Sequence, residues 1–154
     1  MNQYSELLRY IYDLAMGDVF INTVTQGNVE DVDLNKGNIF SLLHVVIDGG
    51  GFTNGSTVLF NVSLQCLALR DINKDEVVED KFWLQDNQVD NHNETLASLN
   101  RLWTIMLKDF DKRDITASEN PTLSKISFEG TNLYDGWDLS LDVELPNTTL
   151  NLCS

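Results

Sequence analysis

Three carboxylates near the end of the sequence, Asp138, Asp142 and Glu144, have the spacing of groups that could act together in acid-base catalysis. On a β-strand, residues two apart lie on the same face at roughly 7 Å from each other. That distance falls in the broad range of paired carboxylates in glycoside hydrolases. A catalytic pair also needs apolar surroundings that raise the pKa of one member, and nothing in the sequence places an apolar wall beside these residues. We expect a solvated strand face, and hydrolysis by Asp138 with Asp142 or Glu144 stays an alternative hypothesis.

Two acidic stretches begin like calcium-binding loops but lack the residues that complete such a loop. In the stretch that starts at Asp71, Glu76 stands where the sharp turn needs glycine, and Phe82 stands where a bidentate glutamate is required. The stretch that starts at Asp31 fails at the same two positions. Neither is expected to be an EF-hand, and weak cation binding by these loops is an open alternative.

The remaining residues with reactive side chains lack the partners that chemistry requires. The glycines at 49–51 are followed by a strand rather than a helix, no lysine is near, and Asp48 would repel a phosphate, so we expect a mobile hairpin loop there. His44 and His92 have no nearby cysteine or histidine with which to bind zinc. Cys66 has no local base and is expected to pack inside a strand face. The sequence therefore predicts no catalytic, cofactor-binding or metal-ligating residues.

The charge balance excludes several classes of partner. Among 154 residues, 24 are Asp or Glu and 10 are Lys or Arg, which gives a formal net charge of -14. A general nucleic-acid binder needs basic patches that hold phosphates, and this chain has a large acidic excess instead. The same excess argues against docking on anionic membranes. With no long apolar stretch, no signal-peptide pattern and only two cysteines, the chain is expected to be soluble and made in a reducing compartment.

The hydrophobic pattern predicts one α+β domain over residues 1–154, an antiparallel β-sheet with two helices packed on it. Leu7, Ile11 and Ala15 recur at helical spacing, and Gly17 is expected to end this first helix. The second helix is expected from about Asn93 to Lys112. Alternating or β-branched segments predict strands at 18–24, 39–47, 58–66, 125–129 and 137–145, the last ended by Pro146.

A long acidic connection at about 71–91 is expected between the sheet hairpin and the second helix. A loop of this length inside a compact domain is usually functional or an interaction arm. It contains one apolar patch, Phe82, Trp83 and Leu84. Because aromatic residues are enriched in the cores of interfaces, this patch is the candidate subunit interface, with packing against the protein's own core as the alternative.

The order of these elements resembles that of tail-terminator-like proteins of tailed bacteriophages. The resemblance rests on VDLNK at 32–36 before the apolar strand at 39–47, and on DNQVD at 86–90 leading into NETLASLNRL at 93–102. The closing segment YDGWDLSLDVELPN at 134–147 also fits. The sequence looks most like the versions found in crAss-like and related phages of Bacteroidetes hosts, and the similarity spans nearly the whole chain.

The resemblance implies a structural virion protein without enzymatic activity or cofactor. Its copies would form a ring, six-fold or twelve-fold, in the phage neck or tail after synthesis in the cytoplasm of the bacterial host. Its partners would be other copies of itself and neighbouring neck, portal or tail proteins. DNA would pass through the lumen without specific binding, in keeping with the acidic composition, and no membrane is involved. The alternative function is a small-ligand or cation-binding module without catalysis.

Overall fold

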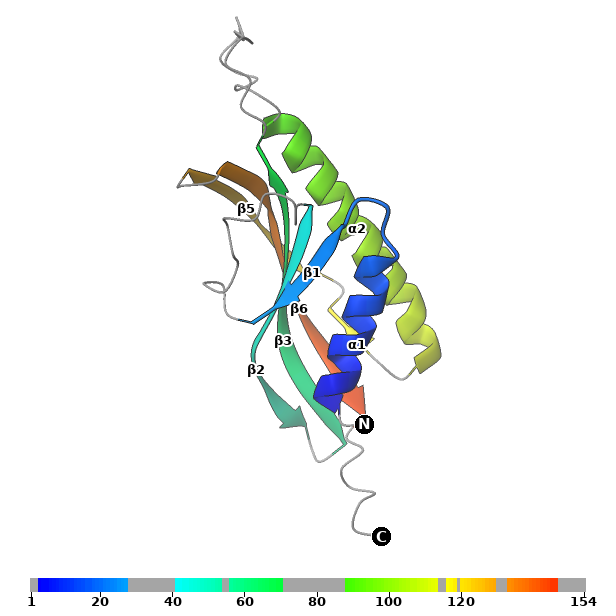
Figure 1. Cartoon of the computed structure of the whole chain (residues 1–154). Helices are drawn as coiled ribbons and strands as arrows, with labels where there is room; N and C mark the ends of the chain where they lie inside the picture. The colour runs from blue at the N-terminus through cyan, green and yellow to red at the C-terminus, as the bar shows by residue number, and fades with distance from the viewer. Residues whose placement is uncertain are drawn as a thin grey trace, which may run out of the picture.

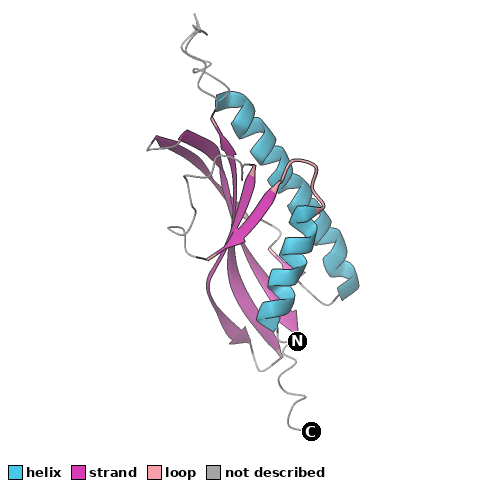
Figure 2. Ribbon diagram, viewed as in Figure 1, coloured by secondary structure: helices cyan, strands magenta, loops and turns pink. Residues whose placement is uncertain are grey.

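The protein consists of a β-sheet with both helices packed on one of its faces, as the computed structural model in Figures 1 and 2 shows. The structure describes residues 3–27, 41–53, 56–70, 88–113, 116–118, 120–129 and 133–146. The helices are α1 (Gln3–Met16) and α2 (Gln88–Arg113). The strands are β1 (Thr23–Gln26), β2 (Leu42–Thr53), β3 (Thr57–Leu69), β4 (Thr116–Ala117), β5 (Thr122–Glu129) and β6 (Leu133–Pro146).

The six strands form one sheet in the order β1-β2-β3-β6-β4, and β5 also pairs with β6. Its centre is the long antiparallel ladder between β3 and β6, which runs from the pair Thr57 and Pro146 to the pair Leu69 and Tyr134. The expected α+β class, a sheet with two helices packed on it, is confirmed. The one exception to antiparallel pairing among the described strands is β1, which runs parallel to β2.

Helix α1 forms as its periodicity predicts, and the chain after it differs from the prediction. Leu7, Ile11 and Ala15 are buried, and the amide of Gly17 donates to the carbonyl of Asp13 over 3.2 Å as the helix ends. The predicted strand at 18–24 is wrong over most of its length. The Asp18 carboxylate accepts the amide of Phe20 at 3.1 Å, which makes a turn, and strand β1 begins only at Thr23.

The glycines at 49–51 belong to strand β2 and not to a loop, so the predicted hairpin loop is wrong. They pair with Asn61, Phe60 and Leu59 of β3, and the ladder continues to Thr53 opposite Thr57. A β-bulge lies between Ile47 and Gly49. A side chain at Gly50 would collide with the carbonyl of Leu59, which explains why glycine is needed where the two backbones approach so closely.

The core lies between the sheet and the two helices. Alternation along β6 is confirmed, because its odd-numbered residues from Leu139 to Leu145 are buried while Ser140 and Asp142 are exposed. Part of the opposite face is also buried, at Leu42, His44 and Leu67. The main cluster comprises Leu7, Ile11, Ala15, Ile21, Leu43, Val45, Val62, Leu64, Cys66, Leu99, Leu102, Met106, Ala117, Leu139, Leu141, Val143 and Leu145.

Helix α2 begins at Gln88, five residues earlier than Asn93, where the sequence predicts its start. Buried Asn91, His92 and Thr95 occupy its first turns, and these polar residues conceal the helix from a search for apolar periodicity. The expected connection at 71–91 is therefore shorter, and its remainder at 71–87 lies outside the described residues. Within the described ranges, neither helix is long and apolar enough to cross a bilayer.

Candidate functional site

Strand β6 places the acidic row on the sheet face away from the helices. Asp138 accepts a hydrogen bond from the Ser63 hydroxyl at 2.5 Å and a weaker one from the Gln65 amide at 3.4 Å. Asp142 is exposed, and Glu144 lies between Leu59 and Thr116 in the ladders. The carboxylates thus share one face, as predicted, and the residues that contact Asp138 are polar rather than an apolar wall.

A shallow hollow of about 410 Å³ covers part of this face. We call it the polar hollow; it is lined by Asp48, Asn61, Val62, Ser63, Ser118, Asn120, Thr122, Ser140, Leu141 and Asp142. No Lys or Arg is among its described lining residues. Nor do the described residues contain a group of three His, Cys, Asp or Glu side chains that could hold a metal ion. The polar hollow offers hydroxyl, amide and carboxylate oxygens, a surface that repels phosphate groups.

Arg101 is held on the outside of α2 by Asp18. Its Nε donates to Asp18 Oδ1 at 2.8 Å and its Nη2 to Oδ2 at 3.0 Å, while the Ser98 hydroxyl donates to Oδ2 at 2.9 Å. Burial would raise the pKa of Asp18, but the hydrogen bonds from Arg101, Ser98 and the Phe20 amide outweigh it and hold the pKa below the ordinary 3.8. The pair joins the turn after α1 to α2.

Arg70 is paired still more deeply. Its Nη2 lies 2.7 Å from Asp135 Oδ1 and its Nε 3.1 Å from Oδ2, with the Arg70 and Asp135 side chains only 7% and 0% exposed. The Ser127 hydroxyl donates to Oδ1 at 2.9 Å, and the Asn91 amide to Oδ2 at 3.4 Å. This network joins Arg70, the residue after β3, to β5, β6 and the start of α2. Arg70 is buried in its ion pair, and Arg101, whose side chain is 42% exposed, donates two hydrogen bonds to Asp18, so both guanidinium groups already have a carboxylate partner.

The two histidines form hydrogen bonds in separate parts of the fold, His44 in β2 and His92 in α2. His44 is buried beside β1, with Nδ1 2.7 Å from the Thr25 hydroxyl. His92, in α2, has Nε2 3.1 Å from the carbonyl of Ile126, and its own carbonyl accepts the Trp137 indole N–H at 2.9 Å. The structure does not bring these histidines together. His44 joins β2 to β1, and His92 joins α2 to β5 and β6.

Cys66 is part of the core, as the sequence predicts. It is fully buried in β3, and burial raises the pKa of its thiol to about 12 from an ordinary 9.0. At a given pH, such a rise lowers the fraction of reactive thiolate about a thousandfold. This environment suits packing and not nucleophilic catalysis.

We expect Cys66 to be inert toward thiol reagents in the folded protein. In a Cys153→Ser variant, which leaves Cys66 as the single thiol, Ellman's reagent should react only as fast as the protein unfolds. In concentrated urea one thiol per chain should react within minutes. A folded protein that reacts at the rate of a free thiol would show that Cys66 is exposed and activated.

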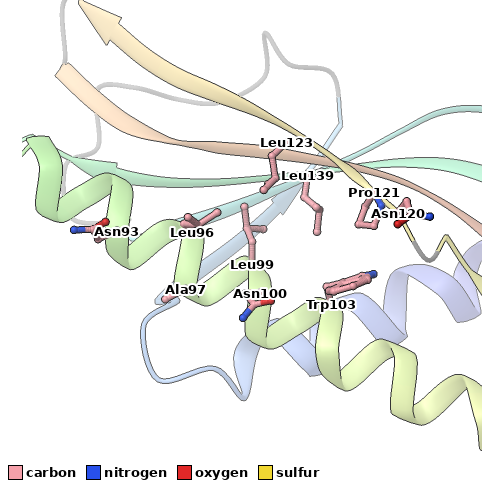
Figure 3. A pocket seen from close by; sticks show the side chains of 10 residues that line it. All are labelled: Asn93, Leu96, Ala97, Leu99, Asn100, Trp103, Asn120, Pro121, Leu123 and Leu139. Atoms are coloured by element: carbon pink, nitrogen blue, oxygen red, sulfur yellow. The ribbon is translucent and has the colours of Figure 1, made fainter.

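A second, larger pocket of about 590 Å³ lies between α2 and the edge of the sheet (Figure 3). Leu123 and Leu139 point from β5 and β6 toward α2, and the Trp103 ring closes one side while its Nε1 donates to the carbonyl of Ser118 at 3.3 Å. We call it the α2–β5 pocket; its described lining is Asn93, Leu96, Ala97, Leu99, Asn100, Trp103, Asn120, Pro121, Leu123 and Leu139. None of these side chains is charged.

Comparisons with known proteins add no family. Neither a scan against protein-family models nor a search of curated proteins finds a match. Functional inference therefore rests on the fold, on these two surfaces and on the resemblance described from the sequence.

Sequence reasoning missed the α2–β5 pocket. The one available signal is Leu123, an apolar residue in the otherwise polar start of β5. The predicted interface patch, Phe82, Trp83 and Leu84, lies outside the described residues, as do both starting aspartates of the calcium-like stretches, Asp31 and Asp71.

Proposed function

We propose that this protein is a structural virion component, tail-terminator-like, whose copies form a ring in the neck or tail of a tailed phage. In such a ring, DNA passes through the lumen, and neighbouring portal, neck or tail proteins bind the ring's two ends. The resemblance of residues 32–47, 86–102 and 134–147 to proteins of crAss-like phages supports this proposal. The α+β fold is compatible with it.

The observation that carries the proposal is the polar hollow. Asp48 and Asp142 lie among hydroxyl and amide groups, with no basic residue among the described lining. A wall of this kind, facing a channel, repels phosphates and gives DNA nothing to hold, because binding requires counter-charges that release condensed ions. The ion pairs of Arg70 with Asp135 and of Arg101 with Asp18 also weaken the attraction of these two guanidinium groups for phosphates.

The two edges of the sheet support assembly as a ring. The exposed end of β2 lies at one edge, and β5 with the α2–β5 pocket lies at the other. These surfaces differ from each other, so contact between copies through them would be heterologous. Heterologous contacts close into a ring when a whole number of copies, each rotated by the same angle, completes one full turn.

Light scattering and negative-stain imaging, with and without neighbouring neck or tail proteins, test this function. We expect rings with six-fold or twelve-fold symmetry, and we expect them to show no retention of duplex DNA at low salt, where electrostatic binding is strongest. A strict monomer that binds no portal or tail protein would contradict the proposal. Rings that hold DNA tightly at low salt would contradict the role assigned to the polar hollow.

The α2–β5 pocket favours a second candidate, a small-ligand-binding module. Its volume of about 590 Å³ lies within the usual range for ligand sites, roughly 300–1,000 Å³. Thermal shift against nucleotides, sugars and divalent ions separates the two candidates, since a ligand that binds the folded state raises the unfolding midpoint. A saturable shift in a protein that never assembles would favour the binding module.

A further inference from the structure

We propose that Phe52 of one copy inserts into the α2–β5 pocket of the next copy. The inference deepens the proposed function, on which it rests, by naming the contact that joins neighbouring subunits of the ring. The occupant of the pocket is a second copy of this chain, and both surfaces belong to the described residues.

Phe52 is built as a protruding apolar group. It is 80% exposed near the end of β2, and every residue from 48 to 53 is exposed. It pairs with Val58, which in turn pairs with the core residue Leu145, so Phe52 lies on the helix-covered face of the sheet. An exposed phenyl ring has a large apolar surface to bury on association.

The α2–β5 pocket has the complementary chemistry. Its walls are aliphatic and aromatic, and its polar groups are the amides of Asn93, Asn100 and Asn120. It opens to solvent, because Leu123 is 46% exposed and Ala97 is exposed as well. An uncharged cavity with one aromatic wall fits a phenyl ring.

Phe52 cannot fill the pocket of its own chain. Phe52 pairs with Val58 of β3. Leu123 pairs with Leu139 of β6, which pairs with Leu64 of β3, six residues further along β3 than Val58. Phe52 and Leu123 also lie on β2 and β5, which are three strands apart in the sheet. With about 3.4 Å per residue and about 4.8 Å per strand, the separation is roughly 25 Å. The contact therefore forms between copies.

The strand edges permit the approach of two copies. Among the described residues, β2 pairs with β1 only through 42–45, so the outer edge of 48–53 is open, and β5 pairs only with β6. Neither lysine nor proline, which commonly block exposed edges, occurs at 48–53. If these edges meet with the helix layers on the same side, Phe52 faces the side of β5 that carries Leu123, because both residues lie on the helix-covered face.

Sedimentation of three variants over a wide concentration range tests the contact. Phe52→Ala removes the inserted group, and Ala97→Trp fills the pocket from the exposed side of α2. Val19→Ala is the matched control, since Val19 is 93% exposed but belongs to neither surface. We expect Phe52→Ala and Ala97→Trp to weaken association at least about 30-fold, the loss typical of a central aromatic residue. Val19→Ala should associate like the wild type, and circular dichroism should show all three variants folded.

A mixture of the two variants tests the head-to-tail direction. Phe52→Ala keeps an intact pocket and Ala97→Trp keeps an intact Phe52, so each mixed pair can form one good contact. We expect heterodimers and no rings in the mixture. If both variants form rings as readily as the wild type, the Phe52 contact is wrong and the ring function stands. If the wild type remains a monomer alone and with its neck partners, the ring function itself fails, and the contact with it.

Discussion

Replacement of Asp135 by alanine is expected to lower the free energy of unfolding by about 3 to 5 kcal/mol, among the largest effects of any single change in this protein. The reason is Arg70, whose side chain is only 7% exposed in the folded protein and would lose the carboxylate that accepts two of its hydrogen bonds. A buried charge without compensation is strongly destabilising, whereas an intact buried pair adds little net stability. Urea unfolding followed by circular dichroism measures the change.

Asp142→Ala is the matched control for Asp135→Ala. Asp142 lies on the same strand but is exposed, so its loss should change stability by no more than about 0.5 kcal/mol. The double variant Arg70→Ala, Asp135→Ala should lose less than the sum of the two single variants, because each single change breaks the same contact. Equal losses for Asp135→Ala and Asp142→Ala would show that the buried pair has no special energetic role.

The same carboxylate makes stability depend on pH. Burial would raise the pKa of Asp135, but hydrogen bonds from Arg70, Ser127 and Asn91 outweigh burial and hold the pKa below the ordinary 3.8. Because the folded-state pKa is the lower one, the ionised group stabilises the fold above the unfolded-state value. This stability is lost as pH falls from about 4 through the folded-state pKa. Asp135→Asn should flatten this part of the stability curve; the remaining slope includes Asp18, whose pKa is lowered in the same direction.

Gly136→Ala is expected to cost at least about 3 kcal/mol, the upper part of the range for overpacked sites. A Cβ at Gly136 would collide with the carbonyl of Cys66, where Gly136 pairs with Leu67 near one end of the ladder between β3 and β6. The Cys66 carbonyl is a backbone group and cannot move aside as the end of a flexible side chain could, so β3 and β6 must separate locally. The midpoint and slope of urea unfolding measure the loss.

Gly51→Ala is the control for Gly136→Ala. Gly51 is also a strand glycine, but a Cβ there would meet nothing within 4 Å. We expect the free energy of unfolding to rise by no more than about 1 kcal/mol, because alanine restricts the unfolded chain. Similar losses at both glycines would mean that the close approach at Cys66 does not restrict the residue type at 136.

Elements with a strong local pattern were predictable from the sequence. The alternation from Trp137 to Leu145 identifies β6 because one face is packed and the other solvated, and Leu7, Ile11 and Ala15 identify α1 in the same way. The two-residue strand β4 has no pattern of its own, since it exists only through its pairing with Glu144 and Val143.

Elements determined by tertiary contacts were not predictable. The start of α2 is polar, and its burial depends on Asp135, which lies 44 residues beyond Asn91 in the sequence. The glycines at 49–51 favour a turn by composition, yet pairing with β3 draws them into a strand. The α2–β5 pocket joins residues from α2, the segment before β5, and two strands, so no local segment of sequence contains it.

The bulge between Ile47 and Gly49 determines which way the aromatic end of β2 points. Side chains alternate strictly along a strand, and one extra residue reverses the alternation beyond it. If Asp48 instead paired with Asn61 in strict alternation, Phe52 would lie opposite Thr57, share a face with His44 and Val46 and project over the acidic side of the sheet. Straightening the bulge at constant chain length would therefore turn the Phe52 ring away from the helix-covered face, which is a simple route by which related chains could gain or lose self-association.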